Sequence, residues 1–104
     1  INAFFYIRTP GSGGTTEIDV KWAAAGSSTW TSIFTTTPKF TSSAAAGARV
    51  DADGSNPATT GVTAPVLDVT ELNRNAGDSL RFDIITAMTG DPITVGCVIF
   101  YRPR

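Results

Sequence analysis

The alternation of apolar and polar residues over short runs is the feature that most limits how this chain can fold. The runs 15–22 and 79–84 place an apolar residue at every second position, which gives a strand one apolar and one polar face. These apolar residues are Ile18, Val20, Trp22, Leu80, Phe82 and Ile84. No window of eleven or more residues keeps the period of a helix. The sequence therefore predicts an all-β chain, with both apolar rows facing the core.

The first and last runs, 1–8 and 93–101, are apolar at almost every position, so each predicts a strand with two apolar faces. We expect these strands to pair, with one face in the core and the other against a neighbouring subunit. The residues expected at this subunit interface are Phe4, Tyr6, Arg8, Val98, Phe100 and Arg102. In the alternative interpretation, both are central strands of one chain, covered by its own loops.

Further short strands are expected over 30–34, 38–41 and 65–72, with loops around an edge strand over 42–64. Turn-forming residues recur every ~8–12 residues, which is typical of a sandwich. The predicted fold is an antiparallel β-sandwich, jelly-roll-like, with seven to eight strands. The 104 residues form one domain, 1–104, and the opening Ile1 indicates a C-terminal fragment of a longer protein.

The charge content argues against several classes of partner. Charged residues make up 16% of the chain, against a typical ~25%, and the net charge is −1. Because the basic residues are scattered singly, the sequence predicts no nucleic-acid binding. No run approaches the ~18 apolar residues of a membrane span, so membrane insertion is not expected either. The single Cys97 lies in an apolar run and is interpreted as a small buried hydrophobe.

Histidine is absent from the chain, which excludes Ser-His-Asp and Cys-His machinery as well as ordinary zinc hydrolysis. A glycosidase could still work with two carboxylates alone. Most of the nine acidic residues, however, occupy polar strand positions or turns. The sequence therefore predicts a protein that binds rather than catalyses, without a cofactor.

Binding candidates come from the tryptophans and from one acidic loop. Trp30 follows a loop of small residues and could stack on a sugar ring, whereas Trp22 lies on an apolar strand face and is expected in the core. Asp51, Asp53 and Asn56 could present oxygen atoms to a ligand. Their spacing does not match a calcium-binding loop, because the glycine is the fourth residue rather than the sixth and Val62 stands where a glutamate is needed. No metal site is predicted.

Three segments together carry a resemblance to a known family. They are Gly11-Ser-Gly-Gly-Thr-Thr-Glu-Ile-Asp-Val20, Trp30-Thr-Ser-Ile-Phe34 with Thr37-Pro38, and Ala76-Gly-Asp-Ser-Leu-Arg-Phe-Asp-Ile84. With the opening apolar strand and the last strands, this order resembles the C-terminal β-sandwich tip domains of phage tail fibres and bacterial trimeric fibre adhesins. The stretch 42–64 departs most from that pattern, being longer and richer in alanine.

The resemblance implies a homotrimer at the tip of a fibre, extracellular on a virion or cell surface. Its expected function is recognition of a host or prey bacterial surface, by binding a glycan or another surface structure. Binding loops differ among such domains, so the resemblance transfers no binding residue to this chain. The alternative function is a purely structural module that caps or trimerises a fibre or virion part and binds no ligand.

Overall fold

The computed structural model describes residues 2–53, 60–90 and 93–100, with side chains described over 4–53, 60–90 and at Gly96. Within these ranges the chain is all-β, as predicted, and every strand pairing is antiparallel. The elements are β1 (Asn2–Thr9), β2 (Thr15–Ala23), β3 (Thr31–Ser32), β4 (Phe34–Thr36), β5 (Lys39–Thr41), β6 (Arg49–Asp51), β7 (Val62–Thr63), β8 (Val66–Leu67), a 3₁₀ turn (Val69–Glu71), β9 (Ser79–Thr86) and β10 (Ile93–Phe100).

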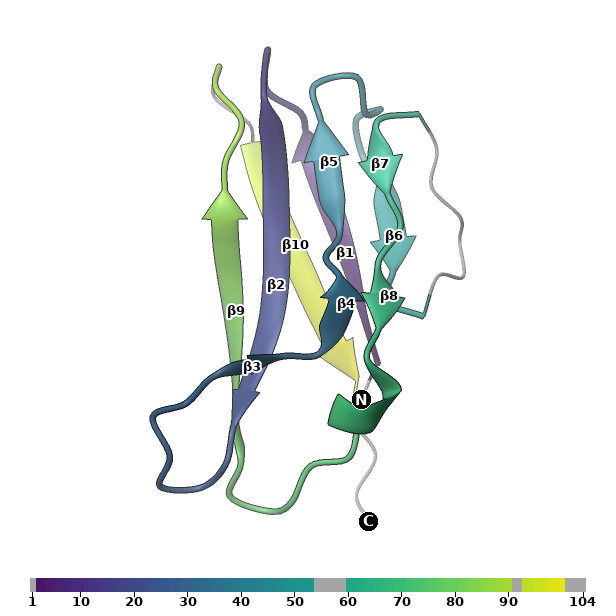
Figure 1. Cartoon of the computed structure of the whole chain (residues 1–104). Helices are drawn as coiled ribbons and strands as arrows, with labels where there is room; N and C mark the ends of the chain where they lie inside the picture. The colour runs from purple at the N-terminus through teal and green to yellow at the C-terminus, as the bar shows by residue number, and fades with distance from the viewer. Residues whose placement is uncertain (1, 54–59, 91–92, 101–104) are drawn as a thin grey trace.

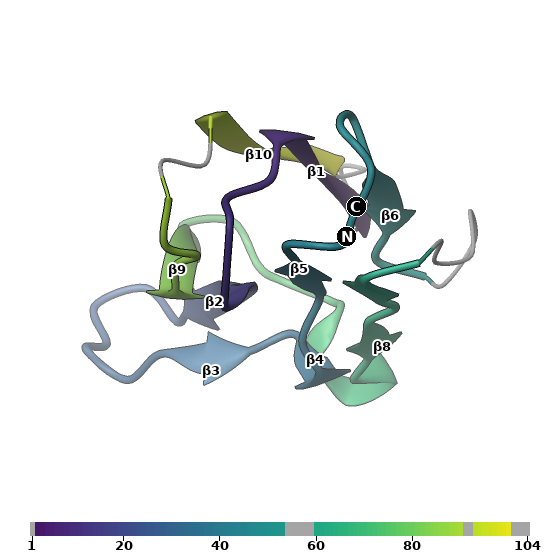
Figure 2. The same cartoon turned by 90° about the horizontal axis from the view of Figure 1, so that it is seen from above.

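The strands form two larger sheets and one strand pair. One sheet has the order β10-β1-β6, the other has the order β3-β2-β5-β7 with β9 on the opposite side of β2, and β4 pairs with β8. Seen from above, β10, β1 and β6 run along one side of the domain, and β9, β2 and β5 lie across from them (Figure 2). Strand β2 therefore occupies the centre of its sheet (Figure 1).

The predicted pairing of the first and last strands is confirmed. Strand β1 pairs with β10 along almost its whole length, from Asn2 opposite Phe100 to Thr9 opposite Ile93. The alternation predicted for β1 also holds, since Phe5 and Ile7 are fully buried whereas Phe4 and Tyr6 are half-buried on the other face.

The core lies between the two sheets and draws on most strands. Its largest fully buried apolar side chains are Phe5, Ile7, Ile18, Val20, Ile33, Phe40 and Val50. The rings of Phe5 and Phe34 meet edge to face, with their centroids 5.7 Å apart and their planes at 63°. Complete burial of a side chain of this size contributes about 1.5–3 kcal/mol, so these residues dominate the packing.

The strand expected over 30–34 is divided in the structure. Strand β3 pairs with β2, and the chain then crosses at Ile33 so that β4 pairs with β8 instead. The Ile33 N–H still donates to the Val20 carbonyl at 3.0 Å, which fixes the crossing point. Trp30 consequently lies before the strand rather than in it.

The region 65–72 is a short strand followed by a turn, rather than one strand. After β8, the Asp68 carboxylate accepts the Thr70 N–H at 3.1 Å and caps the 3₁₀ turn. The sequence places either Val66 or Leu67 in the core. In the structure Leu67 packs against the core and Val66 is exposed. In the described parts of 42–64, which are 42–53 and 60–64, the chain forms β6 and β7, and β6 is the expected edge strand beside β1.

The expectation that Leu80, Phe82 and Ile84 are buried was wrong, although their alternation was right. They lie opposite Trp22, Val20 and Ile18, so they share the inward face of β2. Their exposed fractions are nevertheless 39%, 36% and 52%. Strand β9 pairs with β2 and forms the outer margin of its sheet (Figure 1), where the opposite layer covers the inward face only in part.

Candidate functional site

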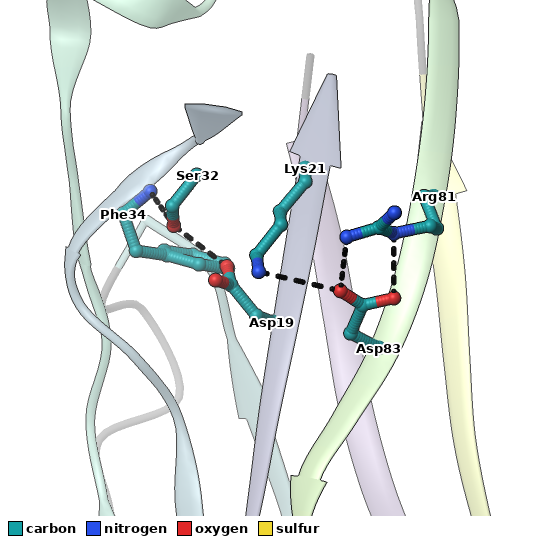
Figure 3. A network of polar contacts seen from close by, with 6 residues as sticks. All are labelled: Asp19, Lys21, Ser32, Phe34, Arg81 and Asp83. Carbon is teal, nitrogen blue, oxygen red and sulfur yellow. Dashed lines mark hydrogen bonds and ion pairs between the residues drawn. The ribbon is translucent and has the colours of Figure 1, made fainter. Parts of the chain in front are cut away.

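The outward face of β2 and β9 carries a cluster of charged side chains. The antiparallel register places Asp19 opposite Asp83 and Lys21 opposite Arg81, on the face away from Ile18 and Val20. Figure 3 shows Lys21 and Arg81 converging on Asp83, whereas the Asp19 carboxylate points to the other side, toward Ser32. The directly opposite residues carry like charges, which is unfavourable, but the diagonal ion pair of Lys21 with Asp83 joins opposite charges across the two strands and helps to hold β9 to the centre of the sheet.

Asp83 is the centre of the cluster. Its Oδ1 lies 2.8 Å from Arg81 Nε, and its Oδ2 accepts from Arg81 Nη2 at 2.9 Å. Lys21 Nζ lies 3.4 Å from Oδ2 (Figure 3). Burial alone would raise the pKa of this carboxyl, but the hydrogen bond and charge of Arg81, together with Lys21, outweigh it and hold the pKa below its ordinary value.

Asp19 has a different environment, because it is only 5% exposed at a position where the sequence predicted a solvated charge. The Ser32 hydroxyl donates to its Oδ1 at 2.6 Å, and the same hydroxyl oxygen accepts the Phe34 N–H at 3.0 Å (Figure 3). Burial raises the pKa of Asp19 above its ordinary value, although Ser32 and Lys21 act in the opposite direction. The β3–β4 crossing, which the sequence did not reveal, is what covers this carboxylate.

The raised pKa of Asp19 predicts a specific pH dependence. The pKa of Asp19 is about 3.8 in the unfolded chain and higher in the folded one, so the folded protein binds this proton more tightly. The contribution of Asp19 to the free energy of unfolding therefore falls as pH rises from about 3.8 through the pKa of the folded state. The lowered pKa of Asp83 acts in the separate window below 3.8. In urea unfolding between pH 4 and 7, we expect Asp19→Asn to gain stability relative to the native protein as pH rises. Parallel pH curves for the two proteins would contradict this assignment.

The Trp30 ring lies beside this cluster and contacts Arg81. The Arg81 guanidinium carbon lies 4.5 Å from the Trp30 ring centroid, a cation–π distance, and the ring is half-buried. The chain reaches this point through a turn in which the Ser27 N–H donates to the Ala24 carbonyl at 2.9 Å. We call Trp30, Lys21, Arg81 and Asp83 the Trp30 patch.

Trp22 has a structural role, and the structure places it beside the core. Its Nε1–H donates to Glu71 Oε2 at 2.8 Å, and the Arg74 guanidinium carbon lies 3.4 Å from its ring centroid. The ring packs partly buried against the core, on the face expected from the sequence. These contacts connect β2 to the 3₁₀ turn and its following loop.

The other candidate ligand-binding residues do not join Trp30 in a single copy. Asp51 lies on β6, opposite Phe4, and its Oδ1 accepts from Arg49 Nε at 2.9 Å. Figures 1 and 2 both place β6 and β9 at opposite sides of the domain. Asp53 is exposed, and Asn56 lies outside the described residues. Over the described part of the chain, no group of three or more His, Cys, Asp or Glu residues is arranged to hold a metal ion.

The face predicted to contact other subunits is partly covered by its own chain. The Arg49 guanidinium carbon lies 3.8 Å from the Phe4 ring centroid, and the Tyr6 ring lies across Gly96 of β10. Arg8 is exposed. The side chains of Val98, Phe100 and Arg102 lie outside the described residues.

The sequence analysis selected Trp30 as a binding candidate but not its neighbours Lys21, Arg81 and Asp83, which were interpreted as the solvated face of two separate strands. The sequence did contain one indication of this cluster, because the polar positions of the runs 15–22 and 79–84 carry both acidic and basic residues. Their proximity depends on the β2–β9 register, which joins residues about 60 positions apart and is not set by a hairpin turn.

Comparison with protein-family models, with curated proteins and with solved structures found no match to this chain. Within the ranges that the structure describes, no helix has the length and apolar character needed to cross a membrane.

Proposed function

We propose that this chain is a β-sandwich recognition domain, the tip of a homotrimeric fibre, which binds a glycan on a bacterial surface through the Trp30 patch. The contact between Trp30 and Arg81 is the observation that carries the proposal. It places an aromatic ring beside Arg81, which with Lys21 and Asp83 can hydrogen-bond to hydroxyl groups. The facing sheets support the sandwich, and the resemblance of the sequence to fibre tips supports the trimer and the extracellular setting.

The chemistry of the patch suits a sugar. An indole ring offers a flat apolar surface for the C–H face of a pyranose, while ammonium, guanidinium and carboxylate groups hydrogen-bond to its hydroxyls. Because Arg81 already restrains the ring, binding loses little side-chain freedom. Lys21, Arg81 and Asp83 carry a net charge of only +1, which favours neutral or weakly acidic sugars over polyanions.

The same geometry favours binding over hydrolysis. A glycosidase presents two carboxyl groups to the bond that it cleaves. Asp19 is almost completely buried against Ser32, and both oxygens of Asp83 contact Arg81 or Lys21. These contacts also support the second candidate, a structural fibre-capping module, because the cluster joins β2 and β9 without any ligand.

A glycan array probed with the fluorescently labelled domain separates the two candidates. We expect a defined set of bound glycans. We also expect Trp30→Ala to weaken their binding at least tenfold in titrations, since stacking of a ligand ring on an aromatic side chain contributes about 1–3 kcal/mol. Phe4→Ala is the matched control, because it removes another ring that contacts an arginine, on the opposite sheet.

Equal loss of binding in Trp30→Ala and Phe4→Ala would point to a general loss of structure rather than to this patch. A folded domain that binds no glycan on the array, and no bacterial cells, would favour the structural module. Release of reducing sugar from a bound polysaccharide would show an activity that the proposal does not include.

A further inference from the structure

The carboxylate of Asp78 joins the loop that leads to Trp30 to the loop that leads into β9. Asp78 Oδ1 accepts the Ala25 N–H at 3.2 Å, and Asp78 Oδ2 accepts the Asn75 N–H at 2.9 Å. Ala25 belongs to the loop 24–30 between β2 and β3, whereas Asn75 belongs to the loop 72–78 before β9. One side chain therefore connects two loops that are far apart in the sequence.

The two loops are in contact as well as hydrogen-bonded. The Asp78 N–H donates to the Asn75 carbonyl at 3.2 Å, so these two residues bond each other in both directions and close the turn 75–78. A Cβ at Gly77 would lie 3.5 Å from the Ala25 Cβ, which is van der Waals distance. Hydrogen bonds from backbone N–H groups to a carboxylate are stronger than those between neutral groups. The turn 75–78 therefore offers a defined attachment point for the loop 24–30.

Hydrogen bonds inside the loop 24–30 extend this attachment toward Trp30. The Ser27 N–H donates to the Ala24 carbonyl at 2.9 Å and closes a turn. The Thr29 N–H donates to Ser27 Oγ at 3.1 Å, one residue before Trp30. After Trp30 the chain enters β3, which pairs with β2. Trp30 therefore lies between a paired strand and a loop that is bonded to Asp78.

Asp78 also directly precedes the strand that carries the arginine partner of Trp30. Strand β9 begins at the next residue, and Arg81 follows Asp78 by three positions. The Arg81 guanidinium carbon lies 4.5 Å from the Trp30 ring centroid. Figure 1 shows the loop after β2 and the loop before β9 at the same end of the domain. The carboxylate thus fixes the loop of the ring and the strand of the cation relative to each other.

Asp68 provides a comparison within the same chain. Its carboxylate accepts the Thr70 N–H at 3.1 Å and the Thr70 hydroxyl at 2.6 Å, so both of these bonds stay inside one turn. The Asp78 carboxylate instead reaches out of its own turn to Ala25. The bond to Ala25 is not needed to close the turn 75–78, and its structural effect is to hold the loop 24–30.

We infer that Asp78 is a positioning residue of the Trp30 patch, which holds the loop 24–30 against the start of β9 and thereby keeps the Trp30 ring beside Arg81. The inference rests on the proposed function, because such positioning matters for recognition only if Trp30 binds a ligand. A ring that is restrained before binding has less freedom to lose when the ligand arrives. In this role Asp78 acts through the loop rather than by contact with the sugar.

Nuclear magnetic resonance relaxation of the two tryptophan indole N–H groups tests the attachment without any ligand. In Asp78→Ala, which removes both acceptor oxygens, we expect the order parameter of the Trp30 indole to fall from about 0.85 to below about 0.6, the values of rigid and flexible groups. The Trp22 indole is the internal control, because its N–H donates to Glu71 and its order parameter should not change. Asp68→Ala is the matched variant, because it removes a carboxylate that holds only its own turn. Its Trp30 order parameter should be native.

Titration with a glycan that the native domain binds tests whether the positioning matters for recognition. We expect Asp78→Ala to weaken binding about three- to tenfold, which corresponds to the net contribution of roughly one hydrogen bond. Asp78→Asn keeps one acceptor oxygen and is expected to lose less affinity, whereas Asp68→Ala should bind as the native domain does. Circular dichroism identifies conditions in which every variant is folded, so that a loss of stability alone leaves the apparent affinity unchanged.

The inference and the proposed function fail in different ways. A Trp30 indole that stays rigid in Asp78→Ala, or one that becomes mobile with no loss of glycan affinity, would overturn the positioning role. Equal weakening by Asp68→Ala and Asp78→Ala would also overturn it, because the effect would then be a general loss of structure. A native domain that binds no glycan, but whose Trp30 indole is released in Asp78→Ala, would overturn the proposed function and leave the attachment in place.

Discussion

Phe5→Ala is expected to lower the free energy of unfolding by about 3–5 kcal/mol, the range found when a large aromatic residue is removed from a core. Phe5 is fully buried in the central strand of its sheet, and its ring meets Phe34 edge to face. Because a domain of this size is stable by about 5–15 kcal/mol, the variant would lose a large part of its stability. Urea unfolding followed by circular dichroism measures the change.

The control for Phe5→Ala is Val69→Ala, which shortens an apolar side chain that is 75% exposed. We expect its effect to stay within about 0.5 kcal/mol. Both variants and the native domain are compared at one protein concentration, because association would make apparent stability depend on concentration. Equal effects of the two substitutions would contradict the placement of Phe5 in the core.

Gly61→Ala is expected to cost about 2–5 kcal/mol, through two separate effects. Gly61 has φ = +76°, a conformation that costs a residue with a side chain about 1–2 kcal/mol. A Cβ at this position would also lie 2.6 Å from the backbone nitrogen of Ala44, too close without a backbone shift, and overpacking of this kind costs about 1–3 kcal/mol. The Gly61 carbonyl accepts the Thr41 N–H at 2.8 Å, so a shift there would disturb the end of β5.

Gly26→Ala separates these two effects. Gly26 has the same φ of +76°, but a Cβ there would meet no atom within 4 Å. Its cost in urea unfolding is expected to be about 1–2 kcal/mol, from the backbone conformation alone. The difference between the two variants therefore measures the close approach of the Gly61 turn to Ala44. If Gly26→Ala were as destabilising as Gly61→Ala, that close approach would have no energetic role.

The sequence was most informative where a local pattern determines the structure. The alternation of apolar and polar residues over 15–22 predicted β2 and the burial of Ile18 and Val20. The two runs that are apolar on both faces predicted the pairing of β1 with β10. Such patterns depend only on which face of a strand meets apolar neighbours. They do not depend on how far the covering layer extends, and for this reason the exposure of Phe82 could not be predicted.

The candidate site was harder to predict because it depends on long-range register. Trp30 could be selected for its residue type, but its contact with Arg81 requires β9 to lie beside β2 in one particular alignment. The burial of Asp19 similarly depends on the chain crossing after Ser32, where a serine hydroxyl bonds both a carboxylate and a backbone N–H. Neither arrangement is encoded in residues close together in the chain.

The pairing of β1 with β10 also has a consequence for the order in which the domain forms. Residues from the beginning of the domain, such as Asn2, find their partners near its end, such as Phe100, so this sheet cannot be completed until nearly the whole domain has been synthesised. Pairings over such long distances in sequence make folding slow. During translation β1 emerges before β10, so Phe5 and Ile7, which are fully buried in the folded domain, stay exposed until β10 is made. We therefore expect nascent chains to need protection from aggregation during that interval.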